Sequence, residues 1–168
     1  MGCSNHILNE VLENDVINNT LIVSKPGIGK TTILRDLARN ISDSGKKVGI
    51  IDERCEITAT YKGVPQNNIG IRTDVLYDVP KPIGMKMMIR TMAPEVIIAD
   101  EIGNKEDVEA IKFAACCGVS GIFSAHGKTP EDIEKNPVLN SLLKEKIIEK
   151  VIFLEKKNGI RNYKTFNY

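Results

Sequence analysis

The chain has 168 residues, of which 42% are hydrophobic and 27% are charged, and its formal net charge is +1. These values are ordinary for a globular protein, and the length is enough for one domain with a sizeable core. The near-neutral charge argues against a nucleic-acid partner. We therefore expect a single domain over residues 1–168, in which residues 1–19 form a short helix and a turn.

The sequence also argues against a membrane span and a secretory signal. No segment is apolar enough to cross a bilayer, and the first fifteen residues carry acids and asparagines where a signal peptide has an apolar core. The four cysteines have no metal-ligand spacing, which favours a reducing, cytosolic compartment. Cys116 and Cys117 lie in an apolar helical stretch, so we expect both to be buried.

The first half of the chain alternates helical and strand patterns. Apolar spacing predicts helices over residues 5–15 and 31–44, and the second of these ends at a glycine. Continuous apolar runs predict buried parallel strands over residues 20–23 and 48–51. Residues 56–82 are rich in glycine, proline and asparagine, and form either a functional loop or short strands without a clear pattern.

The same alternation continues through the middle of the chain. Helices are predicted over residues 85–92 and 105–117, and buried strands over residues 96–99 and 119–125. Strands that alternate with helices predict an α/β fold with a mainly parallel sheet covered by helices.

The C-terminal part has clear boundary signals. Thr129-Pro130 has the pattern of a helix start, and residues 138–149 are expected to be helical. Asn158-Gly159 lies between apolar runs at 151–154 and 160–166, which predicts a β-hairpin.

A glycine-rich segment follows the first strand and opens the next helix: Ser24-Lys25-Pro26-Gly27-Ile28-Gly29-Lys30-Thr31-Thr32. Strand, glycine turn and helix are the context of a P-loop, which binds polyphosphate through backbone N–H groups and a helix N-terminus. We expect the eight residues from Lys25 to Thr32 to bind ATP, with Lys30 at its β- and γ-phosphates and Thr31 on Mg²⁺. Ser24 stands where the pattern has glycine, and we expect a stiffer loop there, not a lost site.

A second motif lies about seventy residues downstream of the P-loop. The strand at 96–99 ends in Asp100-Glu101, which is the Walker B arrangement. We expect Asp100 to hold Mg²⁺ through its water shell and Glu101 to orient and polarise the attacking water. Without a P-loop, the same pair is more often only a surface strand end.

Two further strands end in polar residues. Asp52-Glu53-Arg54 follows the strand at 48–51, and His126 follows the strand at 119–125. Because ligands of an open parallel sheet bind at the carboxyl ends of its strands, all these ends can surround one nucleotide. We therefore include Glu53 and His126 among the candidate catalytic residues. Arg54 is a candidate phosphate contact, although most arginines are simply solvated.

These residues resemble a known superfamily. The run from Ile89 to Gly103, followed by Glu106-Asp107 and Ala110, is similar to the Walker B region of type II and type IV secretion ATPases. Residues 52–56 resemble their Asp box and residues 124–127 their His box. The phrases Asp-Glu-Arg-Cys-Glu-Ile, Gly-Ile-Arg-Thr-Asp-Val and Arg-Thr-Met-Ala-Pro-Glu are closer to the sporulation stage III AA family. The resemblance covers residues 18–156.

The resemblance implies a RecA-like P-loop core that hydrolyses ATP with Mg²⁺ and powers a membrane-associated channel complex during endospore formation. It further implies a homo-oligomer, in the form of a hexamer, docked on membrane proteins of that complex at the cytoplasmic face of the mother-cell membrane. In such rings a neighbour's arginine completes the site, and Arg72 and Arg90 are the candidates. The family also carries a domain before this core, and nineteen residues precede the first core strand here, so we expect that domain to be absent.

Two other functions remain open at this point. The chain can be a nucleotide-binding assembly switch with little turnover, because the family's first domain is missing from it. It can also be a RecA-like DNA motor, against which the near-neutral charge and the small number of aromatic residues weigh.

Overall fold

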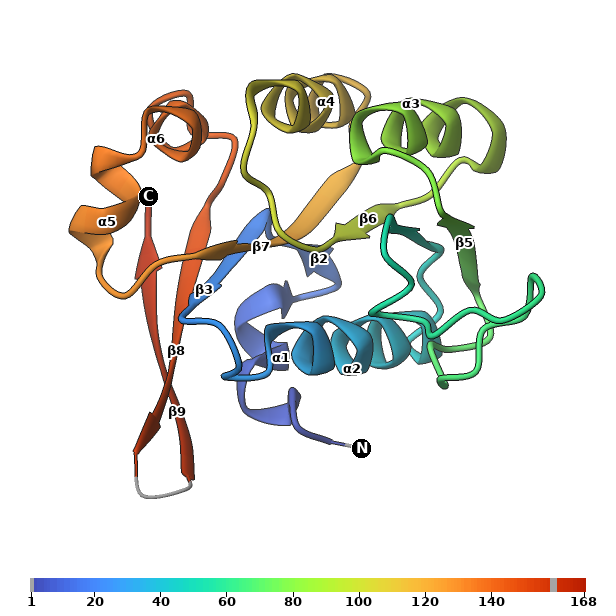
Figure 1. Cartoon of the computed structure of the whole chain (residues 1–168), viewed down its shortest axis with the longest axis horizontal. Helices are drawn as coiled ribbons and strands as arrows, with labels where there is room; N and C mark the ends of the chain where they lie inside the picture. The colour runs from blue at the N-terminus through green and yellow to red at the C-terminus, as the bar shows by residue number, and fades with distance from the viewer. Residues whose placement is uncertain (1, 158–159) are drawn as a thin grey trace.

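The computed structural model describes residues 2–157 and 160–168, and a seven-stranded sheet lies at its centre (Figure 1). The strand order is β5-β4-β6-β7-β3-β8-β9, and every neighbouring pair is parallel except β8 with β9. The strands are β3 (Thr20–Ser24), β4 (Val48–Asp52), β5 (Thr73–Tyr77), β6 (Val96–Ala99), β7 (Ser120–His126), β8 (Lys150–Lys157) and β9 (Ile160–Asn167). The predicted mainly parallel sheet with a C-terminal hairpin is confirmed.

Helices cover both faces of this sheet (Figure 1). The helices on one face are α1 (Asn5–Val11) and α2 (Lys30–Asp43), and those on the other are α3 (Lys81–Met92), α4 (Lys105–Cys116), α5 (Pro130–Lys135) and α6 (Pro137–Lys144). Neighbouring residues of a strand point to opposite faces, so Ile22 packs with the α1–α2 layer while Leu21 and Val23 pack with the α3–α6 layer. Burial on both faces explains why these strands are apolar throughout.

The helix predicted over residues 5–15 is too long. α1 ends at Val11, and the chain continues into a small antiparallel pair, β1 (Leu12–Glu13) and β2 (Val16–Ile17). Asn14 and Asp15 between them have positive φ, which asparagine and aspartate tolerate better than most residues. Turn chemistry therefore overrides the helical periodicity at this point.

The structure differs from the prediction at two further places, residues 56–82 and the start of the following helix. Within the region 56–82 the structure places β5, an edge strand whose residues are only partly buried, which is why it has no continuous apolar run. α3 begins at Lys81, ahead of the predicted residue 85, because Pro82 suits the first turn of a helix.

The helix predicted over residues 138–149 is also too long. α6 ends at Lys144, short of the predicted residue 149, because Lys146 adopts a left-handed φ of 53° and the following N–H groups bond back to the helix. The strands of the predicted hairpin are confirmed, whereas its turn residues Asn158 and Gly159 lie outside the described residues.

Cys116 and Cys117 are exposed, so the prediction that both are buried is wrong. The buried stripe of α4 runs through Val108, Ile111 and Ala114, and the two cysteines at the helix end fall off this stripe. None of the helices in the described ranges has the length and apolar character to cross a bilayer.

Candidate functional site

The P-loop connects the carboxyl end of β3 to α2, and its glycines have the backbone that the loop requires. Gly27 and Gly29 have φ values of 76° and 103°, which residues with a Cβ rarely adopt. Ser24, by contrast, is the last residue of β3 and is not among the residues with positive φ. Its hydroxyl donates to the Lys25 carbonyl at 2.8 Å. The missing glycine therefore costs this loop no backbone strain.

The two predicted magnesium ligands lie together. Thr31 Oγ1 donates to Asp100 Oδ2 at 2.6 Å, although 69 positions separate the two residues in the sequence. The other Asp100 oxygen accepts from the Ser124 hydroxyl of β7 and from the Glu101 N–H. A hydroxyl and a carboxylate are hard oxygen donors, which fits Mg²⁺, an ion held in proteins by few such groups and by phosphate oxygens.

A chain of polar contacts joins the P-loop lysine to the second acid of the Walker B pair. Lys30 Nζ lies 3.1 Å from His126 Nδ1, and His126 Nε2 lies 3.0 Å from Glu101 Oε1. When the lysine ammonium donates to Nδ1, the imidazole proton is on Nε2 and is donated to Glu101. The other Glu101 oxygen pairs with Arg54 Nη1 at 3.0 Å. Both oxygens of Glu101 therefore have partners.

Lys30 is an unusually buried lysine, with 6% of its surface exposed. Burial lowers the pKa of Lys30, and the nearby carboxylates of Asp100 and Glu101 oppose that shift. The charge of Lys30 is therefore poorly solvated, and its neighbours His126, Asp100 and Glu101 compensate it in part.

The backbone of Glu101, two residues after the end of β6, is strained. Its φ is 51°, in the left-handed region that a glutamate seldom occupies, and its N–H donates to Ser124 Oγ at 3.0 Å and to Asp100. Strain of this kind costs roughly 1–3 kcal/mol and persists only where the surroundings enforce it. Here it turns the two acids of the pair in different directions.

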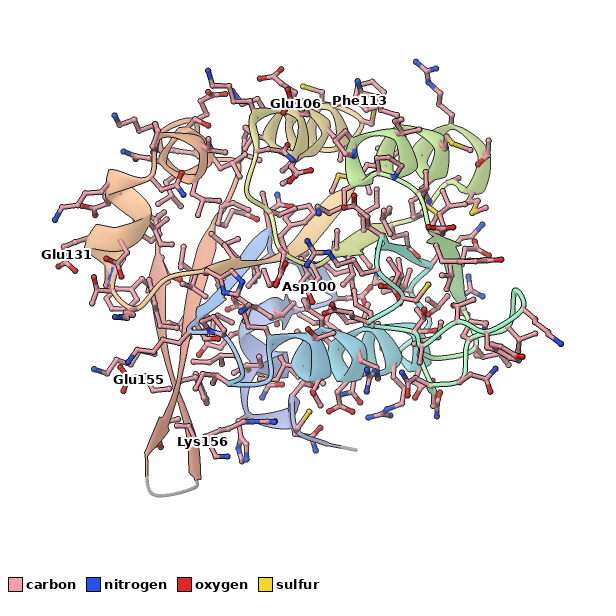
Figure 2. The ribbon with its side chains drawn as sticks, in the orientation of Figure 1. Asp100, Glu106, Phe113, Glu131, Glu155 and Lys156 are labelled. Atoms are coloured by element: carbon pink, nitrogen blue, oxygen red, sulfur yellow. The ribbon has the colours of Figure 1, made fainter. Side chains whose placement is uncertain are left out.

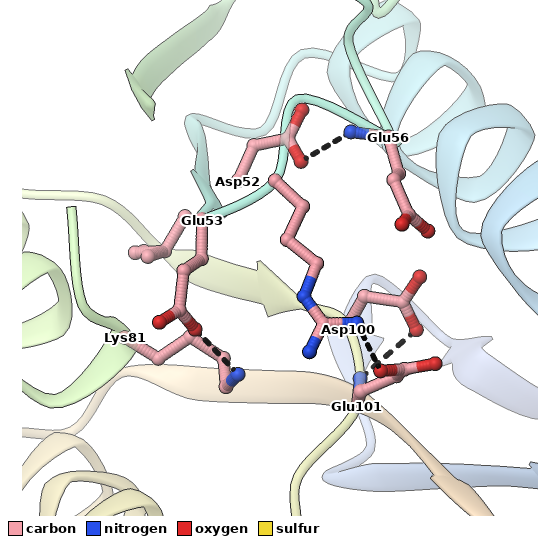
Figure 3. A pocket seen from close by; sticks show the side chains of 8 residues that line it. Asp52, Glu53, Glu56, Lys81, Asp100 and Glu101 are labelled. Atoms are coloured by element: carbon pink, nitrogen blue, oxygen red, sulfur yellow. Dashed lines mark hydrogen bonds and ion pairs between the residues drawn. The ribbon is translucent and has the colours of Figure 1, made fainter. Parts of the chain in front are cut away.

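The two acids at the end of β4, Asp52 and Glu53, have different surroundings (Figure 3). Asp52 is buried and faces its own loop, where its oxygens accept from the N–H groups of Glu56, Ile57 and Thr58 and from the Thr58 hydroxyl. Glu53 lies beside the pocket that Glu101 also lines, and its carboxylate pairs with Lys81 of α3 at 2.7 Å. The structure thus brings Glu53 near the Walker B pair but engages it elsewhere.

Arg72 and Arg90 are not part of this site within one chain. The Arg72 carbonyl accepts from Val48 N at the start of β4, so Arg72 lies at the amino edge of the sheet. Arg90 is in the last turn of α3, beside a surface hollow formed by that helix.

Ser124 is a site residue that the sequence did not single out. It is fully buried in β7 and contacts both acids of the Walker B pair, through the Asp100 carboxylate and the Glu101 N–H. Figure 2 shows Asp100 near the centre of the molecule. A hydroxyl inside an otherwise apolar strand, two residues before His126, was the available signal.

Comparisons with known proteins show the family and the fold of the chain. The chain is 44% identical to stage III sporulation protein AA of Bacillus subtilis (strain 168) over 165 residues, which are 95% of this chain and 53% of that protein. It is similar in fold to the ATPase DotB of Legionella pneumophila (TM-score 0.69, 17% identity, 98% of this chain and 48% of that one). It is also similar in fold to the VirB11 ATPase of the Brucella suis type IV secretion system (TM-score 0.66, 18% identity, 99% of this chain and 52% of that one).

The chain thus spans about half the length of these relatives. The likeness to DotB and VirB11 confirms the predicted RecA-like secretion-ATPase fold. The family described as "Sporulation stage III, protein AA" matches residues 1–165, and the chain belongs to that family.

Proposed function

We propose that the chain is a Mg²⁺-dependent ATPase. The observation that carries this proposal is the 2.6 Å contact between Thr31 and Asp100, which sets a P-loop hydroxyl against a Walker B carboxylate, with Glu101 next to it. ATP is the proposed ligand of residues 25–32, where Gly27 and Gly29 shape the loop and Lys30 supplies the charge for the γ-phosphate. Thr31 and Asp100 would hold Mg²⁺, which when bound would supply neutralisation of the phosphate charge.

The proposed reaction is the hydrolysis of the terminal phosphate. The oxygen of a water molecule bonds to the γ-phosphorus, and the bond between that phosphorus and the β–γ bridging oxygen breaks, which yields ADP and phosphate. Glu101 orients this water and accepts a hydrogen bond from it. His126 and Arg54 hold the Glu101 carboxylate in place, and Glu53 is a secondary carboxylate of the same pocket.

The direct test compares wild-type chain with Lys30→Ala. We expect the wild-type chain to bind ATP and release phosphate when Mg²⁺ is present, and Lys30→Ala to lose most of its affinity for ATP. Lys47→Ala is the matched control, since Lys47 is a half-exposed lysine whose N–H bond to Glu95 and ion pair with Asp74 lie at the amino edge of the sheet. Equal ATP affinity in Lys30→Ala and wild-type chain would contradict the proposal.

A nucleotide-binding switch with little turnover is the second candidate. Both oxygens of Glu101 already accept from protein donors, His126 and Arg54, and these donors compete with a water molecule for the carboxylate and lower its basicity. Tight ATP binding together with phosphate release no faster than in Glu101→Gln would favour the switch.

We further propose that the active form is a homo-oligomer, by family resemblance a hexamer, docked on membrane proteins of the sporulation channel at the cytoplasmic face of the mother-cell membrane. Since Arg72 and Arg90 lie away from the P-loop of their own chain, either would act on a neighbour. Specific activity should then rise with protein concentration, because assembly follows mass action. Mixing Arg90→Ala or Arg72→Ala chains with Lys30→Ala chains should restore part of the activity.

Constant specific activity over a hundredfold dilution, with a monomer in sedimentation throughout, would contradict the shared site. The same result would leave ATP binding by the single chain intact.

A further inference from the structure

The outer part of the C-terminal hairpin extends past the sheet at the edge where the P-loop lies. β8 pairs with β3 from Lys150 to Phe153, whereas β8 and β9 stay paired out to Lys157 and Ile160. In Figure 1 this arm runs beyond the rest of the sheet, on the side where the chain turns from β3 into α2. Figure 2 places Glu155 and Lys156 on it.

Arg161 lies on this arm, opposite Lys156, and its guanidinium packs on the P-loop. A Cβ placed on Gly29 would lie 2.6 Å from Arg161 Nη2 and 3.0 Å from Arg161 Cζ. Gly29 is the N-cap of α2 and immediately precedes Lys30. The glycine therefore serves twice, because it provides the left-handed turn and also leaves room for the arginine.

The N-terminal segment approaches the same guanidinium. Cys3 Sγ donates to the Thr32 carbonyl at 3.6 Å, so Cys3 lies against the first turn of α2. Burial and the nearby Asp36 raise the pKa of the Cys3 thiol, and Arg161 acts on that thiol in the opposite direction. Three segments that are distant in the sequence thus meet at Gly29: the N-terminus, the P-loop and the hairpin.

The charges at this point favour an anion. Lys30 immediately follows Gly29 and Arg161 lies against Gly29, so the glycine-rich turn has two cationic side chains beside it. The carboxylates of Asp100 and Glu101 lie near Lys30, and the dipole of a helix N-terminus favours a further anion over a second cation. Guanidinium is suited to phosphate, because its planar array of N–H donors matches two phosphate oxygens at once.

We propose that Arg161 is a nucleotide-binding residue, through which the chain's own C-terminal hairpin contacts the polyphosphate as a second cation beside Lys30. This inference rests on the proposed function, since it takes a nucleoside triphosphate as the ligand of the P-loop. It differs from the shared site above, because Arg161 acts on the P-loop of the same chain.

The test measures binding of two probes, ATP and inorganic tripolyphosphate, by calorimetry to the full chain and to single variants. Arg161→Ala should weaken binding of both probes by about tenfold or more, which is the loss expected for a hydrogen bond to a charged group. Arg161→Lys should lie in between. Lys164→Ala is the matched control, since it removes the same charge from the exposed surface of the same strand, and it should bind like the wild-type chain.

Each other outcome overturns the inference in a recognisable way. Unchanged binding in Arg161→Ala would show that Arg161 does not contact the polyphosphate. Tighter binding would show that the arginine hinders access of the polyphosphate to the P-loop. A loss for ATP but not for tripolyphosphate would assign Arg161 to the nucleoside. If Arg161→Ala lowers the melting temperature, Arg161→Gln repeats the test with a side chain of similar size. If the wild-type chain binds neither probe, that result would contradict the proposed function itself.

Discussion

Two neighbouring strands of the sheet, β4 and β6, end in the same dipeptide, Asp-Glu, and the two pairs have different tasks. Asp52 is buried, and its oxygens are occupied by donors from the loop that follows it. Asp100 faces residues from two other segments, Thr31 after β3 and Ser124 in β7. Glu53 pairs with Lys81, whereas Glu101 joins the contacts that lead to Lys30.

The difference follows from the place of each strand in the sheet. β6 lies between β4 and β7, so the residues after it face the P-loop across the middle of the carboxyl edge. β4 lies next to the edge strand β5, and a long loop connects these two strands. An acid at the end of β4 therefore organises a loop, and an acid at the end of β6 faces the P-loop. Four predictions test this division, from the largest expected effect to the smallest.

Asp52→Ala should destabilise the fold. It leaves N–H groups of residues 56–58 without their acceptor, and we expect a loss of about 3 kcal/mol in the free energy of unfolding. Urea denaturation measures this loss. Asp52→Asn keeps one acceptor oxygen and should lose less. An Asp52→Ala chain as stable as the wild type would mean that the loop does not depend on this carboxylate.

Glu101→Gln should bind ATP normally and hydrolyse it about a hundredfold more slowly, since the amide cannot act as the base that polarises water. Glu53→Gln should lose much less activity, because Lys81 already holds that carboxylate. Single-turnover phosphate release, beside ATP binding, separates the two. Equal losses in both variants would remove the functional difference between the two strand ends.

Asp100→Asn should weaken Mg²⁺-dependent ATP binding by roughly tenfold, the usual effect of changing a group that orients a metal's shell. Stability should change little, because the amide still accepts from Thr31 or Ser124. A magnesium titration at fixed ATP measures the effect. A shift of the unfolding midpoint without a shift of the magnesium midpoint would make Asp100 a structural residue like Asp52.

Lys30→Met should raise the melting temperature of the nucleotide-free chain by about 2–4 °C, equivalent to roughly 1 kcal/mol, because it removes a buried charge. Burial lowers the pKa of Lys30 below 10.5, so between the two pKa values the native chain binds fewer protons than the unfolded chain. Wild-type stability therefore gains with rising pH in that window, and the advantage of Lys30→Met should shrink as the pH approaches 10.5. An advantage that grows with pH would contradict this explanation.

The sequence predicted the parts of the site that depend on strand ends. Lys30, Thr31, Asp100, Glu101 and His126 follow apolar runs, and a parallel sheet brings such positions to one edge. Ser124 could not be predicted in the same way, because its role depends on the register between β6 and β7. The role of Asp52 was also hidden, since the loop that it binds has no periodic pattern.

Arg161 was missed for another reason. Its contact with Gly29 depends on how far the hairpin extends past β3, and no local pattern gives that length. The lengths of α1 and α6 failed similarly, because turns with left-handed residues, Asn14 and Asp15 after α1 and Lys146 after α6, interrupt helical patterns that continue in the sequence.

In mechanical terms, the C-terminal hairpin is a cantilever. Its root is fixed where four residues of β8 pair with β3, where Leu154 is buried and where Tyr163 donates to the His6 carbonyl. Its arm continues from Glu155 to Lys157, about 10 Å at the rise of an antiparallel strand. A small bend beyond Leu154 displaces the end of such an arm much more than its root, and it breaks no bond between β3 and β8. A force applied to this arm would therefore move the guanidinium over Gly29 while the sheet and the two acids that follow β6 keep their positions.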